Sequence, residues 1–384
     1  MSKHYDYAVI GAGVFGSWTA RFLRGAGASV VLLDAYGAAN SRASSGGETR
    51  VIRMGYGPDE LYTRWAMRSL PHWRELGARS GREFFHPTGV LWLSNDADAY
   101  LKSLYEVLGK AGVRQERLTS AEIHWRWPQL HFPEVTWGVH EPESGLLMAR
   151  SSVQALVAEL AREGVECHTV AALPPKEQGK LTQIKLSSGD SITAGTFIFA
   201  CGSWLPKVFP QLLRDRIFPT RQEVFFLGPP PGSDAFQPPR MPVWLHRTHA
   251  DLPYALPDVE SRGFKIAFDL HGAAFDPDTG ARVVDPASID RLRTYLKLHV
   301  PALAEAPVVE TRVCQYENTW NGDFLIDRHP ELENVWIAGG GSGHGFKHGP
   351  ALGEYLSSRI LKGAPAEPRF SLAAKQTEQQ RSIY

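Results

Sequence analysis

Apolar positions near the start of the sequence follow two different periods in quick succession. Residues 5–10 form a short strand-like run, and residues 14–24 repeat apolar side chains at the spacing of an amphipathic helix. After a turn with two glycines at 25–27, the β-branched run 28–34 predicts a second strand. The pattern therefore predicts a β-α-β unit.

The rest of the pattern alternates between helical and strand-like segments. Alternating apolar and polar residues dominate 221–269, which is typical of antiparallel strands. The segment 334–360 combines a strand, a glycine-rich turn and a closing helix. The other expected elements are helices at 60–77, 97–112, 152–164 and 288–298, and strands at 89–94, 166–170, 180–186 and 196–202.

A glycine motif occupies the first turn of the β-α-β unit. Gly11, Gly13 and Gly16 fit G-x-G-x-x-G, and Asp34 ends the second strand. The first glycine permits the tight turn, the second lets a pyrophosphate approach the backbone, and the third lets helix and strand pack closely. The Asp34 carboxylate is placed to accept hydrogen bonds from a ribose hydroxyl. A dinucleotide site is predicted, but the motif leaves FAD and NAD undecided because both use it.

Composition and charge exclude several classes of partner. The chain has 41 Lys+Arg and 41 Asp+Glu residues, so no net charge favours nucleic acid or an anionic membrane. Its three separated cysteines lack C-x-x-C spacing, so a disulfide framework and a zinc site are unexpected and a reducing compartment is favoured. No signal-peptide pattern, long apolar run or C-terminal targeting motif (the chain ends "RSIY") is found. We expect a cytoplasmic protein with no membrane span and no metal.

Four separated segments carry a resemblance to a known family. In order and spacing, over nearly the whole chain, they are similar to the sarcosine oxidase branch of the D-amino acid oxidase superfamily of flavoproteins. That branch includes monomeric sarcosine oxidase, N-methyltryptophan oxidase, pipecolate oxidase and the fructosyl-amino-acid oxidases. The segments are GAGVFG at 11–16, ASSGGETRVIRMGYG at 43–57, RGFKIAFDLHG at 262–272, and CQYENTWNGDFLID at 314–327 leading into GSGHGFKHGPALGE at 341–354.

The resemblance implies that the cofactor is FAD. In this family a cysteine at the position of Cys314 bonds its sulfur to the flavin 8α-methyl carbon, whereas composition alone would make a lone thiol a small core residue. The helix start at 343–347 would face the pyrimidine side of the flavin, where its N–H groups stabilise negative charge. The expected cofactor-binding residues are Gly11, Gly13, Gly16, Asp34, Ser44, Ser45, Thr49, Arg50, Val170, Gly202, Trp204, Cys314, Gly341, Gly343, His344, Gly345 and Phe346.

The resemblance also implies roles for basic residues. Arg53 and Lys347 match ligands of the substrate carboxylate, a use that suits the guanidinium fork. Arg50, which an extended segment points to the opposite face from Arg53, matches a residue near the flavin. Lys265 aligns with a lysine that promotes oxygen reduction, because a fixed cation stabilises the charge of superoxide. The plain alternatives are solvated arginines, a helix-capping Lys347 and a solvent-facing Lys265.

Substrate-side positions depart from sarcosine oxidase itself. The segment before Thr49 carries histidines in sarcosine oxidase, whereas this chain has Ser45 and Gly46. Pro58 stands at an acidic position, and Asp269 replaces a histidine four residues after Lys265. Tyr254 and Tyr316 match family aromatics near the substrate. A carboxylate beside the reacting amine favours a cationic or hydroxyl-rich substrate larger than sarcosine. The alternative is an Asp269 that points into solvent.

The resulting prediction is a monomeric FAD-dependent amine oxidase with two discontinuous domains. Hydride transfer from an N-substituted amino acid or related secondary amine would give an imine and then H₂O₂ from O₂. Rival readings are a flavin dehydrogenase with another electron acceptor, an NAD-dependent dehydrogenase and a non-catalytic flavin-binding protein. The fold class is α/β plus α+β, with a Rossmann-like FAD-binding domain from 1–80, 150–220 and 320–384 and a mainly antiparallel β-sheet substrate domain from 81–149 and 221–319.

Overall fold

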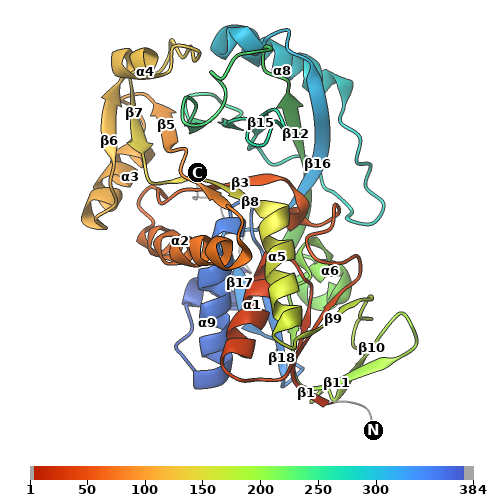
Figure 1. The fold of residues 1–384 in the computed structure, drawn as a ribbon. Helices are drawn as coiled ribbons and strands as arrows, with labels where there is room; N and C mark the ends of the chain where they lie inside the picture. The colour runs from red at the N-terminus through yellow and green to blue at the C-terminus, as the bar shows by residue number, and fades with distance from the viewer. Residues whose placement is uncertain (1–3, 376–384) are drawn as a thin grey trace.

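A computed structural model of the chain describes residues 4–375 and divides into two sheet-based halves (Figure 1). Helices pack beside one sheet in the lower half, and a second sheet with fewer helices forms the upper half. Within 4–375, no helix is both long enough and apolar enough to cross a membrane. The C-terminal "RSIY" lies outside the described residues, so the prediction drawn from it has no structural counterpart.

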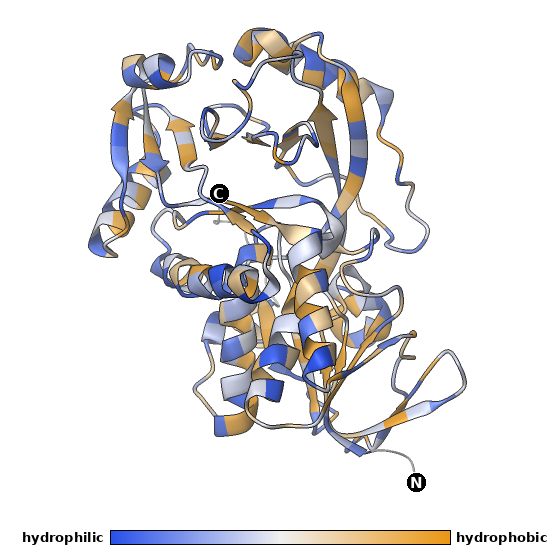
Figure 2. Ribbon diagram, in the orientation of Figure 1, coloured by the Kyte–Doolittle hydropathy of each residue, from blue (hydrophilic) through white to orange (hydrophobic). Residues whose placement is uncertain are grey.

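The lower sheet has seven strands in the order β17-β18-β11-β1-β2-β9, with β10 paired to β11. The central strands are parallel, and β2, β18 and the C-terminal ends of β1 and β11 are buried, which is why these stretches are continuous apolar runs (Figure 2). Their carboxyl ends meet at one edge of the sheet, where such folds bind ligands. The strands are β1 (His4–Ile10), β2 (Val30–Asp34), β9 (Glu166–Thr169), β10 (Gln183–Lys185), β11 (Ser191–Phe199), β17 (Leu325–Arg328) and β18 (Val335–Gly339).

Helices α1, α5 and α9 lie side by side along the lower sheet (Figure 1). Helices α1 and α9 can approach closely because Gly353 has no side chain. A Cβ there would lie only 2.6 Å from the backbone carbonyl carbon of Trp18. This contact ties the N-terminal β-α-β unit to the C-terminal strand-turn-helix. The helices of this half are α1 (Val14–Gly25), α2 (Glu60–Ser80), α5 (Ala149–Arg162), α6 (Leu205–Val208), α7 (Pro210–Leu213) and α9 (Gly349–Lys362).

The upper sheet has eight strands in the order β16-β12-β15-β14-β13-β5-β7-β6, and all neighbours are antiparallel except the parallel pair β13 and β5. Its longest pair, β12 and β16, connects the two halves (Figure 1). Its strands are β5 (Val90–Ser94), β6 (Glu116–Thr119), β7 (Trp137–Glu141), β12 (Ile217–Leu227), β13 (Val243–His246), β14 (Pro253–Leu256), β15 (Phe264–Phe268) and β16 (Val308–Thr319).

A small third sheet lies between the two halves in Figure 1. It consists of β3 (Thr49–Ile52), β8 (Gly145–Met148) and β4 (Phe85–His86) in the order β3-β8-β4. The remaining helices, α3 (Ala99–Lys110), α4 (Ser120–Arg126) and α8 (Pro286–His299), belong to the upper half.

These sheets confirm the predicted fold class. The segments predicted as helices and strands form these elements, with ends shifted by a few residues. The sequence pattern did not predict the short elements β4, β6, α4, β7, β8, α6, α7 and β17, and it also missed the 12-residue strand β16. The domain boundaries stay a prediction.

Candidate functional site

A cavity of about 340 Å³ opens where β1, β2 and β11 end. The first glycine turn forms one wall, and its geometry depends on missing side chains. Gly11 has a φ of 108°, and a Cβ there would lie 2.3 Å from the carbonyl oxygen of Ala200. A Cβ on Gly16 would lie 1.9 Å from the carbonyl oxygen of Gly11, so the helix can pack this closely on the turn only if position 16 is glycine.

Asp34 lies in the wall of this cavity at the end of β2. Its Oδ2 accepts a hydrogen bond from the Ala12 N–H at 2.8 Å, and its Oδ1 accepts one from the Tyr36 N–H at 2.9 Å. Burial raises the pKa of this carboxyl, although these backbone donors oppose the shift. The carboxylate is thus held in place beside the glycine turn, as an acceptor for a ribose hydroxyl requires.

Most of the predicted cofactor-binding residues line the same cavity. The exceptions are Gly16, which packs the helix on the strand, and Thr49, whose carbonyl oxygen accepts a hydrogen bond from Lys265. His344 is the third, and its ring is buried against Tyr56 and the carbonyl of Gly322. The lining residues among those predicted are Gly11, Gly13, Asp34, Ser44, Ser45, Arg50, Val170, Gly202, Trp204, Cys314, Gly341, Gly343, Gly345 and Phe346.

Cys314 lies where this cavity meets a second one of about 360 Å³. Ala43 and Arg50 line both cavities as well. The Arg50 guanidinium donates to the carbonyl oxygen of Ser44 at 2.6 Å and lies 3.5 Å from the Cys314 sulfur. The thiol therefore faces open space beside the Arg50 guanidinium, where a group bound in either cavity could reach its sulfur.

Lys265 lines the second cavity and is buried, so the solvent-facing alternative is wrong. Its Nζ donates to the carbonyl oxygen of Thr49 at 2.7 Å. Burial, together with the Arg50 charge, lowers the pKa of this amine well below its ordinary value. Phe264 and Ile266, which flank Lys265 in the same strand, point into the apolar core instead.

Arg53 and Lys347 are also buried, and both contact Tyr56. The Arg53 guanidinium lies over the Tyr56 ring at 4.2 Å and over the Trp92 ring at 4.7 Å. The Lys347 Nζ donates to the Tyr56 hydroxyl at 2.8 Å and to the carbonyl oxygen of His344 at 3.0 Å. The structure thus brings together two cations from opposite ends of the chain, and neither is a solvated surface charge.

Asp269 is buried and accepts a hydrogen bond from the Tyr316 hydroxyl at 2.7 Å, so it does not point into solvent. Burial, and then the negative charge of Asp269, raises the pKa of nearby Tyr254 to about 12. The three predicted substrate-side residues therefore form one polar group. Tyr316 also lines the larger cavity and joins this group to it.

Glu317 is a cavity residue that sequence reasoning missed. Burial raises the pKa of its carboxyl to about 7, against hydrogen bonds from the Gly340 and Gly341 N–H groups. Within the described part of the chain, its Oε2 has no hydrogen-bond partner. A buried acceptor of this kind fits a cofactor that carries hydroxyl donors, as the ribityl chain of FAD does. Its only signal in sequence was its position in the matched segment, three residues after Cys314.

Glu141 was also missed, and it acts on the site indirectly by holding the backbone next to Arg53. Its carboxylate accepts hydrogen bonds from the N–H groups of Met54 and Gly55 and from the Trp92 ring at 2.7–3.1 Å. These bonds fix the chain directly after Arg53. A buried glutamate at the end of a strand gives no sequence signal of this role.

Comparisons with known proteins agree with this geometry. The family described as FAD dependent oxidoreductase matches residues 6–359. Over 372 residues the chain is 32% identical to a monomeric sarcosine oxidase from Bacillus sp. (strain B-0618), which covers 94% of both chains. It is 26% identical over 354 residues to N-methyl-L-tryptophan oxidase from Yersinia pestis (strain Pestoides F), covering 91% of this chain and 93% of the relative.

The fold comparison extends the match to nearly every residue. The structure of L-proline dehydrogenase from P. horikoshii aligns with a TM-score of 0.85 at 21% identity, over 99% of this chain and 100% of that one. The resemblance to the sarcosine oxidase branch is thus confirmed. The glycine turn, the fixed Asp34 and the free Glu317 oxygen all fit the cofactor that the family binds. The chain is an enzyme and belongs to the family of FAD-dependent oxidoreductases.

Proposed function

We propose that this enzyme is an amine oxidase that acts on the C–N bond of an N-substituted amino acid or related secondary amine. The convergence of buried Arg53 and Lys347 on Tyr56 carries this proposal, because two fixed cations suit a substrate carboxylate. Two relatives support this proposal, because they are named as oxidases of sarcosine and of N-methyl-L-tryptophan. The products are an imine, which water hydrolyses, and H₂O₂.

The chain's own residues orient the substrate and compensate its charge. Arg53 and Lys347 hold the carboxylate, while Tyr254, Tyr316 and Asp269 surround the amine. Bound FAD supplies the acceptor for the hydride and the two electrons that reduce O₂. No strong base is required when the amine binds in its neutral form, because the nitrogen lone pair then drives loss of the hydride.

Lys265 distinguishes an oxidase from a dehydrogenase in this proposal. Electron transfer to O₂ creates negative charge, and a buried cation stabilises that charge more strongly than water would. The position of Lys265 in the cavity beside Cys314 supports this role. Cys314 would hold the cofactor by a thioether from its sulfur to the flavin 8α carbon.

Asp269 points to the class of amine. Its buried carboxylate lies in the group that contains Tyr254 and Tyr316, so a cationic or hydroxyl-rich side chain would be favoured over the small methyl amine sarcosine. Values of kcat/KM across N-substituted amino acids check this, and Asp269→Asn should reduce the preference. A clear preference of the wild-type enzyme for sarcosine would contradict it.

A substrate screen monitored by H₂O₂ release tests the activity. Arg53→Met should raise KM for carboxylate substrates, whereas exposed Arg162→Met should leave KM unchanged. Turnover that survives both Arg53→Met and Lys347→Met would contradict the proposed clamp. Anaerobic reduction by substrate followed by very slow reoxidation on adding O₂ would favour the alternative, a flavin dehydrogenase.

We also infer a cytoplasmic monomer. All three thiols are free, which suits a reducing compartment, and several relatives are named monomeric sarcosine oxidases. Sedimentation of the enzyme at micromolar concentration tests its oligomeric state.

A further inference from the structure

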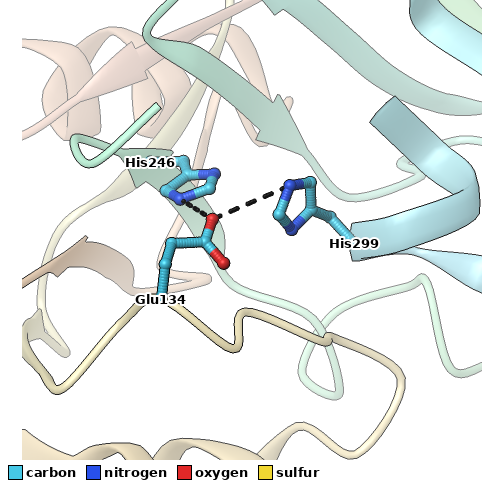
Figure 3. Close-up of side chains that lie close together, drawn as sticks. All are labelled: Glu134, His246 and His299. Carbon is cyan, nitrogen blue, oxygen red and sulfur yellow. Dashed lines mark ion pairs between the residues drawn. The ribbon is translucent and has the colours of Figure 1, made fainter. Parts of the chain in front are cut away.

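Two histidines and a glutamate converge in the upper half, away from the cofactor site (Figure 3). Their ligand atoms all lie within 4.8 Å of one another. Oε1 of Glu134 lies 2.8 Å from Nε2 of His246 and 3.7 Å from Nε2 of His299. We call these three residues the Glu134 cluster, and none of them lines either cavity.

Hydrogen bonding fixes how His299 presents its ring. Its Nδ1 lies 3.0 Å from the carbonyl oxygen of His131, and a carbonyl can only accept a hydrogen bond. Nδ1 therefore carries the proton, and in the neutral ring Nε2 turns its lone pair toward the Glu134 carboxylate. Two acceptors face each other across 3.7 Å, which is the arrangement that a cation between them would stabilise.

His246 is held in a similar way. Its Nδ1 lies 2.9 Å from the Tyr295 hydroxyl, which can accept the proton of that nitrogen. Its Nε2 is near both the Glu134 carboxylate and the Thr248 hydroxyl, the latter at 2.7 Å. A histidine that bonds a metal through Nε2 almost always donates its Nδ1–H to an oxygen, so both imidazoles have the outer partners that a metal site requires.

The surroundings favour a cation held by the protein. His246 and His299 are almost fully buried, and the Phe132 ring lies 4.8 Å from one imidazole and 5.3 Å from the other. His299 is the last residue of the 14-residue helix α8, where the helix dipole is negative. The Glu134 side chain is 36% exposed, which leaves one side open to water.

We propose that the Glu134 cluster binds a divalent transition-metal ion, Zn²⁺, through two imidazole nitrogens and one carboxylate oxygen, with water as the fourth ligand. Zinc–ligand bonds of about 2.0–2.2 Å place tetrahedral ligand atoms roughly 3.3 Å apart. The cluster therefore needs only small side-chain movements to close on the ion.

The site joins three segments that are distant in sequence. Glu134 comes from the loop before β7, His246 ends β13 and His299 ends α8. Binding would fasten α8 to the upper sheet and stabilise the substrate side of the enzyme without entering the reaction. It differs from our expectation of no metal, which rested on the cysteine spacing, because this site uses no cysteine.

A neighbouring histidine provides a matched control. The ring of His249 lies 5.8 Å from that of His246, but its Nδ1 accepts the Asp251 N–H at 3.1 Å. In the neutral ring its proton is therefore on Nε2, and it is not a ligand in the proposed site.

The test uses the flavin-loaded enzyme, freed of metal by dialysis against a chelator and then titrated with Zn²⁺. We expect one equivalent to bind and to raise the thermal unfolding midpoint. Glu134→Gln and His299→Gln should each weaken Zn²⁺ binding by at least about 10-fold, and His249→Gln should leave it unchanged. Co²⁺ in place of Zn²⁺ should give the visible absorption of a tetrahedral site in the wild type and the His249→Gln control alone.

Other results would overturn the proposal. One is the absence of a bound equivalent, which would make the Glu134–His246 contact an ordinary ion pair. Another is equal Zn²⁺ affinity in the wild type and both ligand variants, which would mean that the metal binds elsewhere. Flavin absorbance reports whether each variant is folded. Because the Glu134 side chain is partly exposed, Glu134→Gln should fold and still tests the site if His299→Gln does not fold.

Discussion

The buried Lys265 amine donates a hydrogen bond to the Thr49 carbonyl oxygen at 2.7 Å, and the Arg50 guanidinium lies nearby. Placing an amine among apolar atoms next to another cation is unfavourable, and its lowered pKa reflects that cost. Charges of this kind occur where function requires them more often than where stability does. The alternation of β15 predicted which face Lys265 occupies, but burial of that face could not be inferred from a lysine.

Removing this charge should slow the reaction with O₂ specifically. We expect Lys265→Met to lower the rate of flavin reoxidation on the order of 100-fold, with little change in anaerobic reduction by substrate. Stopped-flow measurement of the two half-reactions separates these effects. Lys185→Met, which changes an exposed lysine, is the control. Equal slowing of both half-reactions would mean that Lys265 holds the site together rather than assisting O₂.

The same residue predicts a pH dependence. Because the pKa of Lys265 is below its ordinary value of 10.5, the cation is present at low pH and is lost as pH rises through the lowered pKa. The rate of reoxidation should therefore fall as pH rises in the wild type, in a window below the ordinary lysine range. The profile should be flat for Lys265→Met, which has no charge to lose, and for Lys265→Arg, which keeps its charge. A wild-type rate independent of pH across that window would contradict the assignment.

Cys314 and Cys201 allow a paired test of covalent attachment, since both line the cofactor cavity. After acid precipitation, yellow colour should stay with the wild-type protein and with Cys201→Ser. It should pass to the supernatant for Cys314→Ser. Burial raises the pKa of the Cys201 thiol, so it should be unreactive, whereas Cys314 lies 3.5 Å from the Arg50 guanidinium. Colour released from the wild type would return Cys314 to the role of a core thiol.

At the scale of elements, the parts of the fold that could be predicted are those with local signals. The first β-α-β unit and the unit formed by β18, its glycine turn and α9 combine clear periodicity with glycine spacing. The missed strand β8 is four residues long and fully buried, so it shows no alternation. Helix α4 has only seven residues and buries one of them. The Glu134 cluster was missed for a different reason, because its ligands meet only through tertiary packing.

The turn between β18 and α9 contains Gly343. Comparing it with Gly363 separates the cost of a positive φ from the cost of a steric clash. Gly343 and Gly363 have φ values of 79° and 60°, so alanine strains both by about 1–2 kcal/mol. A Cβ at Gly363 meets nothing within 4 Å, whereas one at Gly343 would lie 2.7 Å from the Tyr316 ring.

Gly343→Ala should therefore lower the unfolding midpoint more than Gly363→Ala and should also reduce the flavin content. Thermal unfolding followed by tryptophan fluorescence and by flavin absorbance measures both effects. Equal effects of the two substitutions would show that Tyr316 yields without disturbing the turn.

At the scale of the whole molecule, the cofactor cavity is built by both halves. Residues at the ends of β1, β2 and β11 form one part of its wall, while β16 of the upper sheet supplies Cys314, Tyr316 and Glu317. The glycine motif could predict the contribution of β1 and β2, because these strands are adjacent in sequence, whereas β11 is distant from them in the chain. The second part required the family resemblance, since β16 pairs with β12 across a long stretch of chain and Glu317 carries no motif of its own.

A cavity shared in this way should make FAD a determinant of stability. In Cys314→Ser, which lacks the proposed thioether, added FAD should raise the unfolding free energy by about 2.7 kcal/mol at a concentration 100 times Kd. Riboflavin, which lacks the adenosine diphosphate half, should stabilise far less because it cannot reach the glycine turn or Asp34. NAD⁺ should have no effect. Differential scanning fluorimetry across ligand concentrations measures these shifts, and an equal shift with riboflavin would mean that the β1–α1 turn does not hold the pyrophosphate.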